Sequence, residues 1–161
     1  MKYIITTIIT LVLFIATPAL AGNSVITGKV VGVSDGDTIT VLTAEKQQIK
    51  VRLYGIDCPE SKQTFGTRAK QATSDAVFGK QVELEIMDMD KYGRTVALVK
   101  CQGMLLQEVL LKAGMAWIFI KYCKINWLCD NWRHLENEAR LERRGLWQDK
   151  NPVPPWEWRH R

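Results

Sequence analysis

The stretch from Val25 to Tyr54, VITGKVVGVSDGDTITVLTAEKQQIKVRLY, contains three short runs rich in β-branched residues, the later ones alternating polar and apolar side chains. This pattern is typical of strands with one buried face. Turn residues separate the runs, first at Asp35-Gly36 and then in the polar segment 43–48. The stretch therefore predicts a three-stranded meander with strands at 25–33, 37–41 and 49–54.

The same alternation returns later in the chain. It predicts two further strands at 81–87 and 94–99, joined around the turn Tyr92-Gly93. Helical composition or spacing predicts helices over 64–78, about 105–113 and 131–144, and we expect Asp130 to cap the last of these. Five short strands with an inserted helix indicate an α+β chain with a mainly β core, namely a five-stranded OB-fold barrel with about three helices.

The composition is that of a single folded domain. The chain has 161 residues, of which 47% are hydrophobic, and this excludes a disordered or collagen-like protein. Its formal net charge of +5 favours a polyanionic or membrane-surface partner without deciding between them. We place the folded domain at residues 22–150. We expect residues 151–161, a tail rich in Pro and Trp, to lie irregularly on that domain.

The first 21 residues have the pattern of an export signal. Lys2 precedes an apolar run over 3–16, and Pro18 and Ala19-Leu20-Ala21 follow. A membrane anchor is the alternative, but the run is shorter than the roughly 20 residues that span a bilayer. The pattern predicts cleavage after Ala21 and a secreted or periplasmic mature protein that is not held in a membrane.

If the protein is exported, its cysteines can form disulfides, because disulfides form in oxidising compartments. The chain has four: Cys58, Cys101, Cys123 and Cys129. Three pairings are possible. The short loop between Cys123 and Cys129 is the easiest to close, which leaves Cys58 to pair with Cys101. Buried free thiols are the alternative, and no spacing typical of a zinc site is present.

Six acidic residues lie at the ends of predicted elements and could converge at a barrel rim: Asp35, Asp37, Asp57, Glu60, Asp88 and Asp90. Hard oxygen ligands of this kind suit Ca²⁺ or Mg²⁺, although Asp is also common in turns for its own backbone hydrogen bonds. Matching the apolar faces of the strands sets Asp37 opposite Leu53, four residues before Asp57. Four residues span roughly 13 Å of flat strand, so a shared ion requires a strong curl or a bulge.

Two arginines have the chemistry of a phosphate site. Arg52 lies inside the third predicted strand, and Arg94 follows the Tyr92-Gly93 turn. A planar guanidinium binds phosphate bidentately and stays charged, which is what a phosphoryl transition state requires. A buried salt bridge is the alternative for Arg52. Glu60 is suited to act as a general base on a bound water.

Three blocks of the sequence, together, resemble the staphylococcal-nuclease-like thermonucleases (the micrococcal nuclease family). They are Asp35-Gly36-Asp37-Thr38, the segment VRLYGIDCPE over 51–60, and Asp90-Lys91-Tyr92-Gly93-Arg94. The resemblance extends from about Val25 to Trp147. It implies an OB-fold barrel and a Ca²⁺-dependent phosphodiesterase that acts on DNA and RNA.

Residue by residue, the resemblance implies one Ca²⁺ ion held by the carboxylates of Asp37 and Asp57 and by the backbone carbonyl of Cys58. It also implies three catalytic residues, Arg52, Glu60 and Arg94, and products that end in 3′-phosphate. The substrate-binding residues it implies are Lys91, Tyr92 and Tyr122. Ile120 falls where the best-known member has a second pocket tyrosine. We expect a monomer; the alternative function is a non-catalytic OB-fold module that binds nucleic acid.

Overall fold

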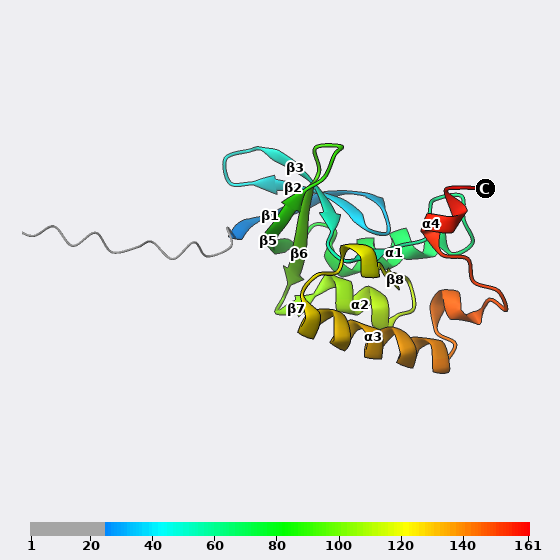
Figure 1. Cartoon of the computed structure of the whole chain (residues 1–161). Helices are drawn as coiled ribbons and strands as arrows, with labels where there is room; N and C mark the ends of the chain where they lie inside the picture. Colours follow the sequence, from blue (N-terminus) through cyan, green and yellow to red (C-terminus); the bar gives the residue numbers. More distant parts are fainter. Residues whose placement is uncertain (1–24) are drawn as a thin grey trace, which may run out of the picture.

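The computed structural model of the chain describes residues 25–161 (Figure 1). The predicted signal segment 1–21 and its cleavage site lie outside the described residues. Over residues 25–161 we find no helix with both the length and the apolar character needed to cross a bilayer.

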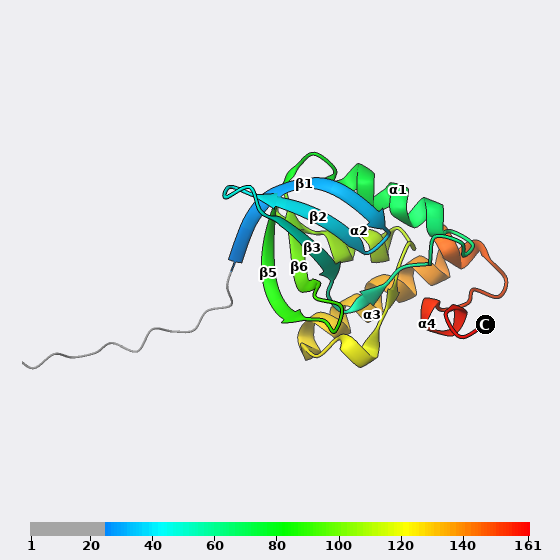
Figure 2. The ribbon, with the colours of Figure 1, turned by 90° about the horizontal axis from the view of Figure 1, so that it is seen from above.

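Five strands form a closed barrel, as predicted. They are β1 (Val25–Asp35), β2 (Thr38–Thr43), β3 (Gln48–Leu53), β5 (Gln81–Met89) and β6 (Thr95–Cys101). Neighbouring strands pair in the order β3-β2-β1-β5-β6, and a parallel pairing of β3 with β6 closes the ring. Figure 2 shows β1 and β5 curving around this barrel. The result is a five-stranded barrel with a mainly β core, as the alternation predicts; the parallel pairing of β3 with β6 was not predicted.

The register between β2 and β3 is the one that the apolar faces predict. Ile39 pairs with Val51, and Val41 pairs with Ile49. Ile39, Val41 and Val51 are completely buried inside the barrel. Register irregularities in β1, between Val30 and Gly32 and again near its end, add twist to that strand. The twist helps to close a barrel from strands this short.

Four helices accompany the barrel: α1 (Gly66–Val77), α2 (Leu106–Lys112), α3 (Asn126–Leu141) and the single turn α4 (Pro155–Trp158). Figure 1 shows α2 and α3 below the strands. The first three helices are predicted, but α3 begins at Asn126 and not after Asp130. Leu128 and Cys129 are buried on the same side of α3 as Trp132, so packing extends the helix past the expected cap. The tail is not wholly irregular, because α4 forms with a proline at its first turn.

Several short elements complete the fold and were not predicted. They are the strands β4 (Ile56–Asp57), β7 (Met104–Leu105) and β8 (Trp117–Ile118), and the 3₁₀ turns η1 (Ile120–Tyr122) and η2 (Gly145–Gln148). β4 pairs with β8 in a small second sheet. That pairing ties the chain segment after β3 to the segment before α3.

The hydrophobic core has two parts. The larger joins the barrel interior to the helices and includes Trp132, which is fully buried. The smaller gathers Trp117, Leu146 and Trp147, and Trp156 of the tail packs against it. The tail is therefore attached to the domain through aromatic packing.

One of the two favoured disulfides is present. Cys123 and Cys129 are bonded with their Cα atoms 5.9 Å apart, whereas Cys58 and Cys101 are buried free thiols. The predicted Cys58–Cys101 bond is wrong because the two side chains pack against different turns of α1. Cys58 lies next to Ala69 beside Gly36, and the Cys101 sulfur contacts the Ala76 carbonyl. Seven residues of helix separate those positions by about 10 Å.

Thiol titration tests this assignment. Denatured protein without reductant should expose the two free thiols, and reductant should raise the number to four. We expect reduction of Cys123–Cys129 to lower the free energy of unfolding by only about 2 kcal/mol, because the bond closes a short loop. Denaturant unfolding with and without reductant measures this loss. No free thiol in the denatured protein would contradict the assignment.

Candidate active site

Asp37 lies in the tight turn between β1 and β2, directly before the first residue of β2. Its carboxylate is buried, with the residue 6% exposed. Its Oδ2 accepts the backbone N–H of Cys58 at 2.7 Å, and its Oδ1 accepts the Thr38 hydroxyl at 3.3 Å. Gly36 is required here, because a Cβ at that position would lie 2.6 Å from the Cβ of Cys58. The β1–β2 turn is thus packed against the residue that follows β4.

Asp57 returns to Asp37 through a bend after β3. Gly55 makes the bend with φ of +68°, a conformation that glycine adopts without strain, and Asp57 then pairs with Trp117 of β8. Asp57 is 1% exposed. The Nη2 of Arg52 lies 3.2 Å from Asp37 Oδ2 and 2.8 Å from Asp57 Oδ1. The chain therefore bends as strongly as the strand register required for Asp57 to approach Asp37. One guanidinium nitrogen of Arg52 bridges the two carboxylates.

The electrostatics of this cluster favour a cation. Burial raises the pKa of Asp37 to about 7; the charge of Arg52 works in the opposite direction, and the charges of Asp35 and Asp57 raise it further. Burial alone would lower the pKa of Arg52, but the charges of Asp37 and Asp57 outweigh it and raise that pKa. The positive charge of Arg52 thus offsets only part of the effect of burial on the Asp37 carboxylate.

Arg94 is positioned by the loop that joins β5 to β6. Its Nε donates to Asp90 Oδ2 at 2.7 Å, and its Nη1 lies 3.4 Å from the Thr38 hydroxyl beside Asp37. Although burial opposes it, hydrogen bonds from the backbone and side chain of Arg94 and from the backbone of Tyr92 lower the pKa of Asp90. Asp90 therefore serves to orient Arg94 and does not join the carboxylates of Asp37 and Asp57.

Glu60 lies in the loop between β4 and α1. Its side chain is 38% exposed, and its backbone N–H donates to Gln63 Oε1 at 3.1 Å. The loop packs tightly on the start of α1, where Gly66 leaves no space for a Cβ beside the Glu60 carbonyl. Glu60 is thus a partly solvated carboxylate on a constrained loop, close to Asp57.

Arg159 contacts two of the candidate active-site residues, and the sequence analysis missed it. Its Nη2 lies 2.7 Å from Asp57 Oδ2, and its Nη1 lies 2.6 Å from Glu60 Oε1. These contacts cross about a hundred residues of sequence. No local pattern predicts these contacts; the only signal was that a tail rich in Pro and Trp was expected to lie on the domain.

The three predicted substrate-binding residues fall in two places. Tyr92 is 72% exposed beside Arg94, whose Cζ is 5.6 Å from the ring centre, and Lys91 lies over the same ring. Tyr122 is 53% exposed and packs edge-on against Phe119. Exposed aromatic rings next to cations are suited to stacking on bases, but Tyr122 belongs to an aromatic group separate from Tyr92.

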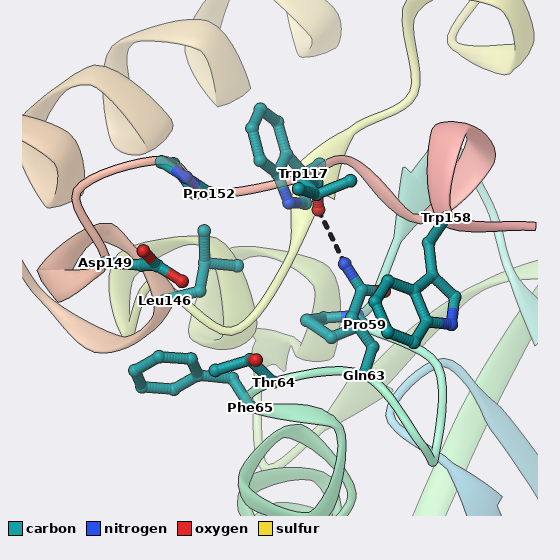
Figure 3. A pocket seen from close by; sticks show the side chains of 10 residues that line it. Pro59, Gln63, Thr64, Phe65, Trp117, Leu146, Asp149, Pro152 and Trp158 are labelled. Atoms are coloured by element: carbon teal, nitrogen blue, oxygen red, sulfur yellow. Dashed lines mark hydrogen bonds between the residues drawn. The ribbon is translucent and has the colours of Figure 1, made fainter. Parts of the chain in front are cut away.

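Two cavities lie between the tail and the Glu60 loop. Figure 3 shows the smaller one, of about 40 Å³, where Gln63 reaches the Val153 carbonyl next to Trp158. The second is a cleft of about 300 Å³. It is lined by Glu60, Ser61, Lys62, Trp158 and Arg159. The first is too small for a nucleotide, whereas the second opens directly at Glu60.

The site offers some, but not all, of the oxygen ligands that Ca²⁺ needs. Within residues 25–161 no group of three or more His, Cys, Asp and Glu side chains could hold a metal ion. Asp37 and Asp57 offer two hard carboxylates that already share one positively charged nitrogen. Ca²⁺ takes about six to eight oxygen ligands and accepts carbonyls and water among them, so these two residues fit when such ligands complete the shell. Burial raises the pKa of the Cys58 thiol, and the hard oxygen that this residue can offer Ca²⁺ is its backbone carbonyl.

Comparisons with known proteins place the chain in a family. A profile of the family described as staphylococcal nuclease homologues matches residues 50–149. The matched span contains Arg52, Asp57, Glu60 and Arg94, and it ends before the tail that carries Arg159.

Three relatives support the match over most of the chain. An uncharacterized endonuclease of Escherichia coli O157:H7 is 42% identical over 155 residues, which cover 95% of this chain and 97% of that protein. A micrococcal nuclease of Shigella flexneri is 39% identical over 157 residues, which cover 92% of this chain and 87% of that protein. A staphylococcal-like nuclease of Arabidopsis thaliana is 43% identical over 113 residues, or 70% of this chain and 34% of its own length.

Proposed function

Because the chain belongs to the staphylococcal nuclease family and is a nuclease, we propose that it hydrolyses phosphodiester bonds of both DNA and RNA with one Ca²⁺ ion. The observation that carries this proposal is the convergence of Arg52 on the buried carboxylates of Asp37 and Asp57. In this proposal Asp37, Asp57 and the backbone carbonyl of Cys58 hold the ion. When bound, the ion polarises a phosphoryl oxygen and lowers the pKa of bound water.

Glu60 acts on the attacking water in the proposed reaction. Its carboxylate accepts a proton as the water oxygen bonds to phosphorus. The bond from phosphorus to the 5′ oxygen breaks, that oxygen takes up a proton from the solvent, and the phosphate remains on the 3′ end of the other product. Glu60 then releases its proton to the solvent. Partial exposure beside a cleft of about 300 Å³ suits Glu60 to this role, because water can reach it.

Arg52 and Arg94 stabilise the charge on the phosphate during the reaction. Both stay protonated, and a planar guanidinium matches two phosphoryl oxygens at once. Asp90 fixes the Nε of Arg94, so its terminal nitrogens are held in place before the substrate arrives. Because the guanidinium group is already oriented, little free energy is spent on moving it when the transition state forms.

The proposed substrate-binding groups do not distinguish deoxyribose from ribose. Lys91 supplies positive charge, and Tyr92 and Tyr122 supply exposed rings on which bases can stack. Stacking is tolerant of sequence and favours single strands or opened duplexes. The net positive charge of the chain adds long-range attraction to polyanions.

We also propose that the protein is exported, by cleavage after Ala21, and acts as a monomer in the periplasm or outside the cell. The Cys123–Cys129 bond supports export, because disulfides persist in oxidising compartments.

Cleavage assays test the proposed metal dependence. With Ca²⁺, purified protein should degrade linear DNA, circular DNA and RNA, and excess chelator should abolish each activity. The products should be poor primers for a polymerase until a phosphatase removes their 3′-phosphate. Asp57→Asn, which keeps the size of the side chain and removes its charge, should weaken Ca²⁺ binding in calorimetry. Full activity in chelator would contradict the role of Ca²⁺.

A further inference from the structure

Arg159 occupies the part of the active site where the proposed chemistry needs free oxygen atoms. It contacts both oxygens of Asp57, at 2.7 Å and 3.3 Å, and it contacts Glu60 Oε1 at 2.6 Å. The hydrogen bond to Asp57 raises the pKa of Arg159 against the effect of burial, and the bond to Glu60 raises it further. Arg159 is therefore a permanent positive charge between two carboxylates.

The tail that carries Arg159 is anchored at two points. The Trp156 ring stacks on Phe119, with centroids 4.9 Å apart and planes 15° apart, and it also contacts Trp117. Gln63 donates to the Val153 carbonyl at 2.6 Å while its Oε1 accepts the Glu60 N–H. Figure 3 shows Trp158 lying beside Gln63 and Pro59. Arg159 is thus delivered by a docked segment that is linked to the Glu60 loop.

These contacts compete with the metal ion and with the attacking water. Asp57 is 1% exposed, and its oxygens already serve Arg52 and Arg159. A metal ligand must offer an oxygen lone pair, and a second cation at the same carboxylate is repelled by the guanidinium. Arg159 also holds one of the two carboxylate oxygens of Glu60, Oε1, in a hydrogen bond.

We propose that the C-terminal segment 152–161 is a latch that closes the active site of the metal-free protein, and that Arg159 leaves Asp57 when Ca²⁺ binds. This inference rests on the proposed function, because it takes Asp57 to be a Ca²⁺ ligand. The geometry distinguishes Arg159 from Arg94. Both terminal nitrogens of Arg159 are engaged by carboxylates that the reaction needs, whereas Arg94 is oriented through its Nε by Asp90, outside that set.

A closed latch weakens the apparent binding of Ca²⁺, and this effect can be measured. If the binding-competent open form is a fraction of the molecules, the apparent Kd exceeds the intrinsic Kd by the inverse of that fraction. By linkage, Ca²⁺ must loosen the tail as much as the tail weakens Ca²⁺ binding.

Calorimetric titration of the full chain with Ca²⁺ tests the latch. Arg159→Ala should lower the Kd by about tenfold or more, as expected for a tail that is closed in at least about 90% of the molecules. Trp156→Ala should also lower the Kd, because it removes the anchor and keeps the Arg159 charge. Arg161→Ala is the matched control; it removes one positive charge from the same tail and should change the Kd less than about twofold, because exposed charges are screened by salt.

Hydrogen exchange gives a readout that does not depend on titration heats. Adding Ca²⁺ to the wild-type protein should speed exchange of the amides of residues 157–161, which form the hydrogen bonds of α4 and its end.

An unchanged or weaker Ca²⁺ affinity in Arg159→Ala, with normal binding by the wild-type protein, would overturn the latch and leave the proposed function standing. Tail exchange that Ca²⁺ does not alter would overturn it as well. If neither protein binds Ca²⁺, the proposed function fails and the latch fails with it.

Discussion

Glu60→Gln is expected to lower kcat by about 10²- to 10⁴-fold, the range typical of losing a general base. Glutamine keeps the shape of the side chain but cannot hold the proton of the attacking water. The fold should persist, because Glu60 lies on a partly exposed loop and its backbone hydrogen bonds to Gln63 remain. KM should change little, since the interaction forms mainly in the transition state.

Initial rates on a single-stranded oligonucleotide with saturating Ca²⁺ measure this effect, and thermal unfolding checks the fold. Glu138→Gln is the matched control, because it removes the same charge from an exposed position on α3. Near-normal turnover by Glu60→Gln at unchanged Ca²⁺ occupancy would show that another group accepts the proton.

The barrel strands were predictable because their signal is local. Alternation with a period of two marks each strand, and the buried faces fix which residues pair, as with Ile39 and Val51. The parallel closure of β3 onto β6 carries no such signal, because it depends on how all five strands curve. The start of α3 was missed for the same reason: burial of Leu128 against the core overrides the local cap signal at Asp130.

The candidate site was predictable only in part. Its residue types were visible at strand ends, but the approach of Asp57 to Asp37 depends on one positive φ at Gly55 and on pairing with β8. From the geometry of a flat strand we could predict only that the chain must bend between Leu53 and Asp57. The Cys58–Cys101 pairing failed because elimination among cysteines says nothing about which turn of α1 each one meets.

Arg159 shows the limit of sequence reasoning most clearly. A tail arginine has no spacing relation to Asp57 or Glu60, and its place is set by aromatic packing of Trp156 on Phe119. Contacts of this kind follow from the tertiary fold and from no periodic pattern.

Arg94→Ala is expected to lower kcat by about 10²- to 10³-fold, comparable to the loss of one oriented donor at a developing negative charge. Stability should fall by at most about 1 kcal/mol, because the pair with Asp90 is partly solvated. The turn should survive, since the backbone N–H groups of Tyr92 and residue 94 still donate to Asp90. Arg94→Lys should recover little activity, because an ammonium group lacks the planar pair of donors.

Two comparisons isolate the role of Arg94. Ca²⁺ affinity should stay near the wild-type value, because Arg94 contacts neither Asp37 nor Asp57, whereas Asp57→Asn should weaken it. Arg133→Ala removes the same charge from an exposed ion pair on α3 and should leave turnover unchanged. A similar loss in both arginine variants would mean that Arg94 acts only through overall charge. A large loss confined to Arg94→Ala, with the ion still bound, would show that its guanidinium acts on the phosphate itself.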